Sequence, residues 1–171
     1  MRAGWLIGVA AGLALVSCQE DVTTVGAPAP STAVHSTVGT LLHAASGGDG
    51  DSWKDTHGVE YRLGLVNTPE LSECYGGTAS RMRKQLTAPG FRATSYTTDK
   101  YGRHVSIIYL VDGRNLNVLL ARNGYANDRY LTEFRHENPS LAAQLDPAFA
   151  AARREHLGVW GACGSTQAPA S

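Results

Sequence analysis

Residues 59–70 read Val-Glu-Tyr-Arg-Leu-Gly-Leu-Val-Asn-Thr-Pro-Glu, and the fold of the chain depends on this stretch. Apolar side chains alternate with polar or small ones through its first seven positions. Because successive side chains of a strand point to opposite faces, the alternation predicts a half-buried strand over residues 59–66. Arg62 is directed away from the core side of this strand. A Thr-Pro pair then turns the chain, and Glu70 follows the turn.

Signals on either side extend this strand into an α+β domain. Residues 52–54 and 59–66 flank Asp-Thr-His-Gly, which is a natural hairpin connection. Elsewhere the patterns predict a strand at 37–45, a helix at 77–86, strands at 91–96 and 105–111, a helix capped by Asn115 and stopped by Gly124, and a last helix from Asp146-Pro147 to 156. The strand at 105–111 is nearly all apolar, which favours a central position. This order of elements is typical of an α+β fold that can include a small barrel.

Four charged residues in and around the strand at 59–66 have the chemistry that phosphodiester hydrolysis requires. Asp51 closes an Asp-Gly-Asp turn before the strand, Glu70 follows it, and Arg103 stands behind a second turn. A hard cation prefers oxygen ligands such as the Asp51 carboxylate, and the planar fork of arginine meets two phosphate oxygens at once. Taken alone, Arg62 and Glu70 could be a surface ion pair, and Arg103 could be a solvated turn residue. Their occurrence together favours a phosphate site.

Asp51, residues 62–70 and residues 98–103 resemble, in order and approximate spacing, the staphylococcal-nuclease-like (thermonuclease) family. Asn-Gly-Tyr-Ala at 123–126 and Leu-Gly-Val-Trp at 157–160 also look like motifs of that family. The resemblance implies an OB-fold, a five-stranded β-barrel with about three packed helices. It also implies hydrolysis of DNA and RNA that depends on one calcium ion and leaves 3′-phosphates.

The resemblance implies a role for each residue that matches a family motif. Asp51 would ligate calcium through its carboxylate, and Thr68 through its backbone carbonyl. Glu70 would position or deprotonate the attacking water. Arg62 and Arg103 would clamp the phosphate and stabilise the charge that builds on it. The physics agrees with these roles, because a metal ion and two guanidinium groups can neutralise the charge of a phosphoryl transition state.

Further positions match the family or depart from it. Lys100, Tyr101 and Tyr130 match positions that contact the phosphate or sugar of the nucleotide, whereas a second family tyrosine falls on Thr132. The second calcium-binding aspartate of the family falls on Asn67. An asparagine carbonyl still ligates calcium, but one negative charge is lost, which predicts a weaker affinity for the metal.

The N-terminal residues have the layout of an export signal. Residues 1–17 hold one basic residue and an apolar run too short to span a bilayer, and they end in Leu-Val-Ser before Cys18. This ending resembles the lipobox of bacterial lipoproteins, whose cysteine carries the acyl chains; ordinary secretion that removes Cys18 is the alternative. We expect an exported protein with a lipid anchor in the cell-envelope membrane, or else a secreted one. A flexible tether at 18–36, the folded domain at 37–164 and a disordered tail at 165–171 complete the expected organisation.

The chain has three cysteines, an odd number for an exported protein. If Cys18 is lipidated, Cys74 and Cys163 remain as a pair in an oxidising compartment. Closing that loop would stabilise the fold by roughly 4–5 kcal/mol in the chain-entropy model. Two unrelated buried thiols are the alternative, and the absence of a C-x-x-C spacing argues against a cysteine metal site.

The charges of the chain balance, with 15 basic and 15 acidic side chains. A protein that holds long duplexes by charge alone is usually more basic, so the balance favours a compact, local phosphate site. We expect a monomer, because the sequence has no heptad repeat. A nucleic-acid-binding module with weak or no catalysis is the alternative function, and Asn67 and the neutral charge favour it. A structural envelope domain would leave the arginines and the glutamate unexplained.

Overall fold

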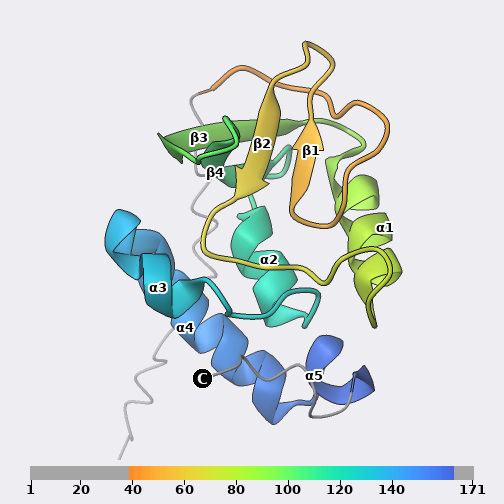
Figure 1. The fold of residues 1–171 in the computed structure, drawn as a ribbon, viewed down its shortest axis with the longest axis vertical. Coiled ribbons are helices and arrows are strands. Elements are labelled where there is room, and N and C mark those ends of the chain that lie inside the picture. Colours follow the sequence, from red (N-terminus) through yellow and green to blue (C-terminus); the bar gives the residue numbers. More distant parts are fainter. Residues whose placement is uncertain (1–38, 164–171) are drawn as a thin grey trace, which may run out of the picture. The chain divides into compact units, whose positions relative to one another are not determined.

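The structure is a computed structural model, and it describes residues 39–163 (Figure 1). The expected signal segment, the lipidation site Cys18, the tether and the tail at 165–171 lie outside the described residues. Among the helices of the described range, none is both long and apolar enough to cross a membrane.

Four strands of the described chain form one mixed sheet. They are β1 (Ser52–Lys54), β2 (Glu60–Leu63), β3 (Phe91–Thr98) and β4 (His104–Leu110). Their spatial order is β1-β2-β4-β3, with β2 parallel to β4 and the other neighbours antiparallel. The register pairs Arg62 with Ser52 on one side and with Val105 on the other. The predicted hairpin and the central position of β4 are confirmed.

The strand predicted at 37–45 appears, within the described residues, only as two isolated bridges. Leu42 pairs with Phe91 at the start of β3, and Ala44 pairs with Asp55 just after β1. This segment therefore passes from one edge strand to the other and forms no continuous ladder along either. The closed five-stranded barrel implied by the resemblance is not confirmed, and the described chain is an α+β fold with a four-stranded mixed sheet.

Helices follow the strands as the sequence predicted, although their number differs. They are α1 (Gly76–Thr87), α2 (Leu116–Arg122), α3 (Leu131–Phe134), the 3-10 turn η1 (Arg135–Glu137), α4 (Pro139–Arg154) and α5 (Val159–Ala162). The Asn115 side chain caps α2 by accepting a hydrogen bond from the Val118 N–H at 3.3 Å. The helices predicted at 77–86 and after Asn115 are therefore confirmed.

The predicted start of the last helix at Asp146-Pro147 is wrong. α4 begins at Pro139, where the Asn138 side chain accepts a hydrogen bond from the Leu141 N–H at 3.0 Å. An asparagine cap followed by proline at the first helical position is itself a strong start signal. The sequence contains this signal at 138–139, and Asp146-Pro147 imitates it further along the chain.

Pro147 lies inside α4 without ending it. Proline removes one hydrogen bond from a helix interior and crowds the preceding turn. Leu141 and Leu145 before the proline and Phe149 after it are buried in the same core. Each such side chain contributes roughly 1.5–3 kcal/mol on burial, so the continuous apolar face outweighs the defect.

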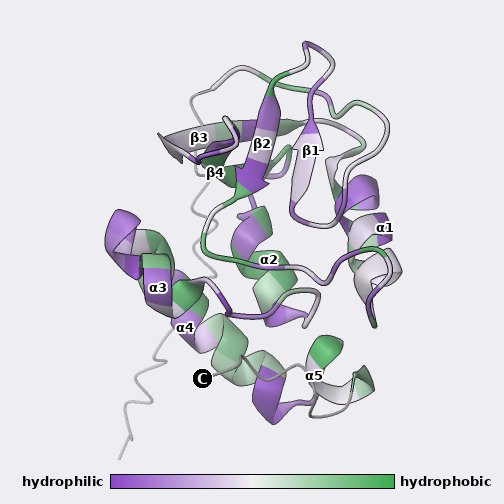
Figure 2. Cartoon of the chain, viewed as in Figure 1, coloured by the Kyte–Doolittle hydropathy of each residue, from purple (hydrophilic) through white to green (hydrophobic). Residues whose placement is uncertain are grey.

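The core of the domain lies between the sheet, α2 and α4. Figure 2 shows the apolar stretches of these two helices in green. Asn117 of α2 is a fully buried polar side chain in this core. Its oxygen accepts from the Ile108 N–H at 3.0 Å, and its amide nitrogen donates to the carbonyls of Gly64 at 3.0 Å and Ser106 at 3.1 Å. Asn117 thereby fixes the end of β2 against β4, two residues beyond Arg62.

Cys74 and Cys163 are joined by a disulfide, with their Cα atoms 5.7 Å apart. The predicted partners are thus paired. The bridge ties the loop that follows Glu70 to the end of α5, so it restrains a segment next to the candidate site from the far end of the chain.

Replacing both cysteines by serine is expected to lower the free energy of unfolding by roughly 2–5 kcal/mol. The unfolded chain then regains the freedom of a loop whose ends are 89 residues apart. Urea denaturation of the wild-type protein and of Cys74→Ser/Cys163→Ser measures this change. Equal denaturation midpoints and slopes would contradict it.

Candidate active site

Asp51 and Arg62 form a buried ion pair. The pairing of β1 with β2 brings them together, and the Leu63 N–H donates to the Asp51 carbonyl at 2.8 Å. The Arg62 Nη1 lies 3.0 Å from the Asp51 Oδ1, and both side chains are less than a tenth exposed. The second carboxylate oxygen accepts the Thr68 N–H at 2.6 Å, and the Ser52 hydroxyl donates to the first at 3.2 Å.

Burial raises the pKa of Asp51, whereas Arg62 opposes this shift, the neighbouring Asp49 adds to it and the hydrogen bond from the Thr68 N–H opposes it. Arg62 is thus the positive charge that offsets the burial of the Asp51 carboxylate. A cation next to Asp51 would stabilise its ionised form, because an opposite charge within a few ångströms favours the charged state.

Arg103 is positioned by the turn that joins β3 to β4. The Asp99 carboxylate accepts from the Arg103 Nε at 2.7 Å and from the backbone N–H groups of Tyr101 and Arg103 at 3.0 Å. Partial burial raises the pKa of Asp99, but these hydrogen bonds together hold it below its usual value. The Arg103 Nη1 also donates to the Ser52 hydroxyl at 3.1 Å. Ser52 thus contacts both Arg103 and Asp51.

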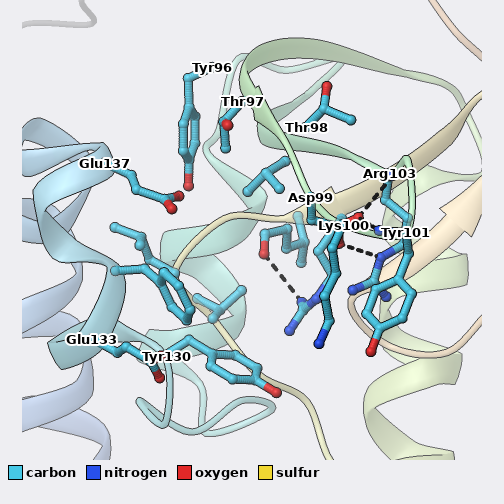
Figure 3. A pocket seen from close by; sticks show the side chains of 16 residues that line it. Tyr96, Thr97, Thr98, Asp99, Lys100, Tyr101, Arg103, Tyr130, Glu133 and Glu137 are labelled. Carbon is cyan, nitrogen blue, oxygen red and sulfur yellow. Dashed lines mark hydrogen bonds and ion pairs between the residues drawn. The ribbon is translucent and has the colours of Figure 1, made fainter.

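A cavity of about 560 Å³ brings five of the predicted site residues together. They are Arg62, Lys100, Tyr101, Arg103 and Tyr130. Figure 3 shows that Lys100, Tyr101 and Arg103 lie at one end of this cavity, while Tyr96 and Glu137 lie at the other. The guanidinium carbon of Arg62 is 5.5 Å from the centre of the Tyr130 ring, and that of Arg103 is 5.3 Å from the Tyr101 ring. Such cation–aromatic contacts limit the motion of the guanidinium groups.

The other predicted residues do not line the cavity. Asp51 and Thr68 lie behind Arg62, to which Asp51 is bonded. The Asn67 amide donates to the Asn127 side-chain oxygen at 3.2 Å. Glu70 is exposed on the loop beyond Thr68, and its backbone N–H donates to the Glu73 carboxylate at 2.8 Å.

The oxygens around Asp51 fit a calcium ion in their chemistry. The Thr68 hydroxyl oxygen is buried and has no hydrogen-bond partner among the described residues. Gly50 allows the Thr68 side chain to pack this closely, because a Cβ there would lie 2.6 Å from that oxygen. Within residues 39–163 no group of three His, Cys, Asp or Glu side chains could enclose a metal. Calcium held here would take Asp51 as its carboxylate ligand, and the rest of its shell would come from neutral oxygens.

Arg83 is a supporting residue that the sequence did not predict. It lies on α1 and is 1% exposed. Its Nε and Nη2 donate to the Asp49 carbonyl at 3.0 and 2.8 Å, Nη2 also donates to the Gly47 carbonyl at 2.9 Å, and its guanidinium lies 4.9 Å from the Trp53 ring. Burial lowers the pKa of Arg83, while Asp49 and Asp51 oppose this shift. Arg83 therefore holds the loop that carries Asp51. Its burial could have been predicted from the sequence, because Arg83 follows the buried Ala79 by four residues and so lies on the same face of α1.

Glu133 and Glu137 also line the cavity, although no sequence motif predicts a role for them. They come from α3 and η1, two short elements without a clear sequence pattern. Nothing in the sequence distinguished these glutamates from other surface charges, because their position depends on how the 131–137 segment packs across from β3.

Comparisons with known proteins agree with this geometry. The model of the family described as "Staphylococcal nuclease homologue" matches residues 60–162, a range that contains Arg62, Glu70 and Arg103. The chain is 30% identical over 103 residues to a protein named "Uncharacterized endonuclease" from Escherichia coli O157:H7 and to one of the same name from Escherichia coli. Each alignment covers 60% of this chain and 63% of the relative.

A third relative is "Endonuclease YhcR" from Bacillus subtilis (strain 168), which is 31% identical over 90 residues. That alignment covers 50% of this chain and 7% of the relative. The chain thus spans less than two thirds of the length of these relatives. Because the family model matches more than half of this chain, the chain belongs to the staphylococcal nuclease homologue family.

Proposed function

We propose that this protein is a calcium-dependent nuclease that hydrolyses phosphodiester bonds in DNA, RNA or both and leaves 3′-phosphates. One observation carries the proposal: Arg62 from β2 and Arg103 from the turn before β4 line a single cavity. The family and the endonuclease relatives support a nuclease; the calcium requirement and the product are inferred from the resemblance of the motifs.

Each arginine is held by part of its guanidinium group, and the rest of the group makes no hydrogen bond to the described residues. Arg62 uses Nη1 for Asp51 and for the Leu63 carbonyl, and Arg103 uses Nε for Asp99 and Nη1 for Ser52. The Nη2 of each has no hydrogen bond to the described residues. Two donors fixed in advance can meet phosphate oxygens and the charge that develops on them without reorganising first.

We assign calcium to the oxygens of Asp51, Thr68 and Asn67. Bound there, the ion would supply positive charge next to the phosphate and so lower the barrier to attack by water. Glu70 takes the role of the base that orients and deprotonates this water, while Lys100, Tyr101 and Tyr130 hold the flanking nucleotide. We also propose an OB-type arrangement for this domain, in which residues 39–45 take the position of the fifth strand.

A binding module without turnover is the second candidate. It is favoured by the exposed position of Glu70, which does not line the cavity. If the general base Glu70 stays outside the phosphate pocket, nucleic acid still binds but its hydrolysis is slow.

The two candidates differ in one assay. Full-length protein purified in detergent is incubated with single-stranded DNA and with RNA in the presence of calcium, of magnesium and of a chelator. A nuclease of the proposed type cleaves with calcium and stops with chelator. Retention of nucleic acid without cleavage at millimolar calcium would leave only the binding module.

Asn67→Asp is expected to lower the calcium concentration for half-maximal activity by about tenfold, because a second carboxylate adds charge to the ligand set. Titrating activity against free calcium measures the change. Asn123→Asp, on the exposed end of α2, is the matched control for net charge and should leave the titration unchanged. An identical shift in both variants would place Asn67 outside the calcium site.

We also propose that Cys18 carries a lipid anchor and that the protein is a monomer in the cell envelope. Cys18→Ser is expected to move the protein from the membrane fraction to the soluble fraction, because the acyl chains supply the hydrophobic contact with the bilayer. Fractionation of cells that express each form measures this. Equal membrane retention of both forms would contradict the anchor.

A further inference from the structure

The loop that carries Glu70 buries little surface of its own. Residues 70–74 are all exposed. Inside the loop, the Glu73 N–H donates to the Glu70 carbonyl at 2.9 Å, and the Glu70 N–H donates to the Glu73 carboxylate at 2.8 Å. Both hydrogen bonds are local. They shape the loop, but they do not attach it to the rest of the domain.

The loop is attached to the C-terminal half of the domain on both sides of Glu70. Before Glu70, the backbones of Asn67 and Asn127 exchange hydrogen bonds at 3.2 and 2.7 Å. After it, the disulfide joins Cys74 to Cys163 at the end of α5. Glu70 therefore lies on a short span between two attachments, and the second of them is covalent.

Tyr75, the residue after Cys74, has a backbone conformation that tyrosine rarely adopts. Its φ is 69°, in the left-handed region where a bulky side chain is uncommon. Its ring stacks on that of Tyr125, with ring centres 5.8 Å apart and 27° between the planes. Such a conformation persists where the surrounding structure holds it. The neighbouring disulfide and the stacked ring therefore oppose relaxation of this part of the loop.

The stacking partner and α5 are fixed to each other. Tyr125 follows Gly124, whose carbonyl accepts the Val159 N–H at 2.8 Å. The backbones also approach closely here, because a Cβ on Gly124 would lie 2.1 Å from the Leu157 carbonyl. Opening the disulfide leaves these contacts in place. The exposed loop is therefore the part that gains freedom.

The disulfide can be reached from solvent through one of its two cysteines. Cys74 is exposed, whereas Cys163 is 6% exposed. Exposed disulfides are the more readily reduced ones. One thiolate of an external dithiol attacks the Cys74 sulfur, forms a mixed disulfide and releases the Cys163 thiolate. The second thiolate then closes the reagent into a disulfide and releases the Cys74 thiolate. Two electrons pass from the dithiol to the protein, and both cysteines take up protons from water.

We propose that the disulfide between Cys74 and Cys163 positions Glu70, so that the oxidised protein cleaves nucleic acid and the protein reduced by a dithiol binds it without efficient cleavage. The inference rests on the proposed function and adds its regulation. Arg62 and Arg103 are held by partners outside the loop, so phosphate binding does not need the disulfide. Glu70 acts only where it reaches the attacking water, and a displacement of about 1 Å can slow a reaction about a hundredfold.

Cleavage of single-stranded DNA by full-length protein in detergent and calcium, before and after treatment with dithiothreitol, tests the inference. Reduction is expected to lower the single-turnover rate at saturating protein by roughly tenfold to a hundredfold, while the half-saturating protein concentration stays the same. Reoxidation with oxidised glutathione should restore the rate. Cys74→Ser/Cys163→Ser should show the reduced rate with or without dithiothreitol, which controls for other effects of the reagent. Equal rates before and after reduction would overturn the inference.

Tyr125 tests the attachment of the loop while the disulfide stays closed. Tyr125→Leu removes the ring on which Tyr75 stacks and is expected to lower the single-turnover rate several-fold with no change in half-saturation. Tyr125→Phe keeps the ring, so its rate should match that of the wild type. A wild-type rate in Tyr125→Leu would show that the loop does not depend on its contact with the C-terminal half.

Hydrogen exchange separates the loop from the chemistry. Reduction is expected to speed amide exchange in residues 70–76 and to leave β2 unchanged. Equal acceleration in both segments would show global opening and overturn a local role of the disulfide. Calcium-dependent cleavage that reduction does not slow overturns this inference and leaves the nuclease in place. No cleavage by the oxidised protein at millimolar calcium overturns the proposed function, and exchange in residues 70–76 then decides by itself whether the disulfide holds the loop.

Discussion

Arg103→Ala is expected to lower kcat by two to three orders of magnitude, with little change in the calcium concentration needed for activity. Removing one preorganised donor to the developing charge of a transition state typically has this effect. Arg103 contacts Asp99 and Ser52, but it makes no bond to Asp51 or Thr68, where we assign calcium. The loss should therefore appear in the chemical step. Single-turnover cleavage of single-stranded DNA at saturating calcium measures it.

Arg114 provides the matched control for Arg103. It donates from Nε to the Asp112 carboxylate at 2.8 Å in a similar turn, but it is exposed and does not line the cavity. Arg114→Ala should leave cleavage unchanged. Arg103→Lys keeps the charge but not the planar fork, and an intermediate rate is expected. Wild-type cleavage by Arg103→Ala would remove this arginine from the mechanism.

Arg62→Met is expected to destabilise the protein by about 3–5 kcal/mol, as well as to abolish cleavage. The change leaves the Asp51 carboxylate buried without its partner, and breaking one side of a buried ion pair has an effect of this size. Urea denaturation at neutral pH measures it. Arg122→Met breaks an exposed pair with Glu155 and should change stability by about 0–1 kcal/mol.

The pH dependence of Arg62→Met gives a second measurement of the same effect. Burial raises the pKa of Asp51 and Arg62 opposes that shift, so removing Arg62 raises it further. The folded variant then keeps a proton that the unfolded chain releases near pH 3.9. Stability is therefore lost as pH rises from about 4 through the folded pKa, and the difference from wild type should shrink in acid. A difference that is independent of pH would contradict an unpaired Asp51.

Local patterns predicted several elements correctly. The hairpin of β1 and β2, the apolar central strand β4 and the Asn115 cap of α2 depend on residues within a few positions of each other. Strand alternation and capping are local effects, so neighbouring residues suffice to specify them. The start of α4 differs from the predicted one because two prolines offer a start signal, and burial of the long apolar face favours the earlier of them.

The sequence by itself determined which residue types are available to the site, because Arg62, Glu70 and Arg103 were identifiable from the order and spacing of their motifs. Only the tertiary structure decided that Arg62 is paired with a buried Asp51, that Arg83 holds the Asp51 loop, and that Glu137 faces the same cavity as Arg103. These contacts join segments far apart in the chain. Their existence depends on strand register and helix packing, which no local pattern encodes.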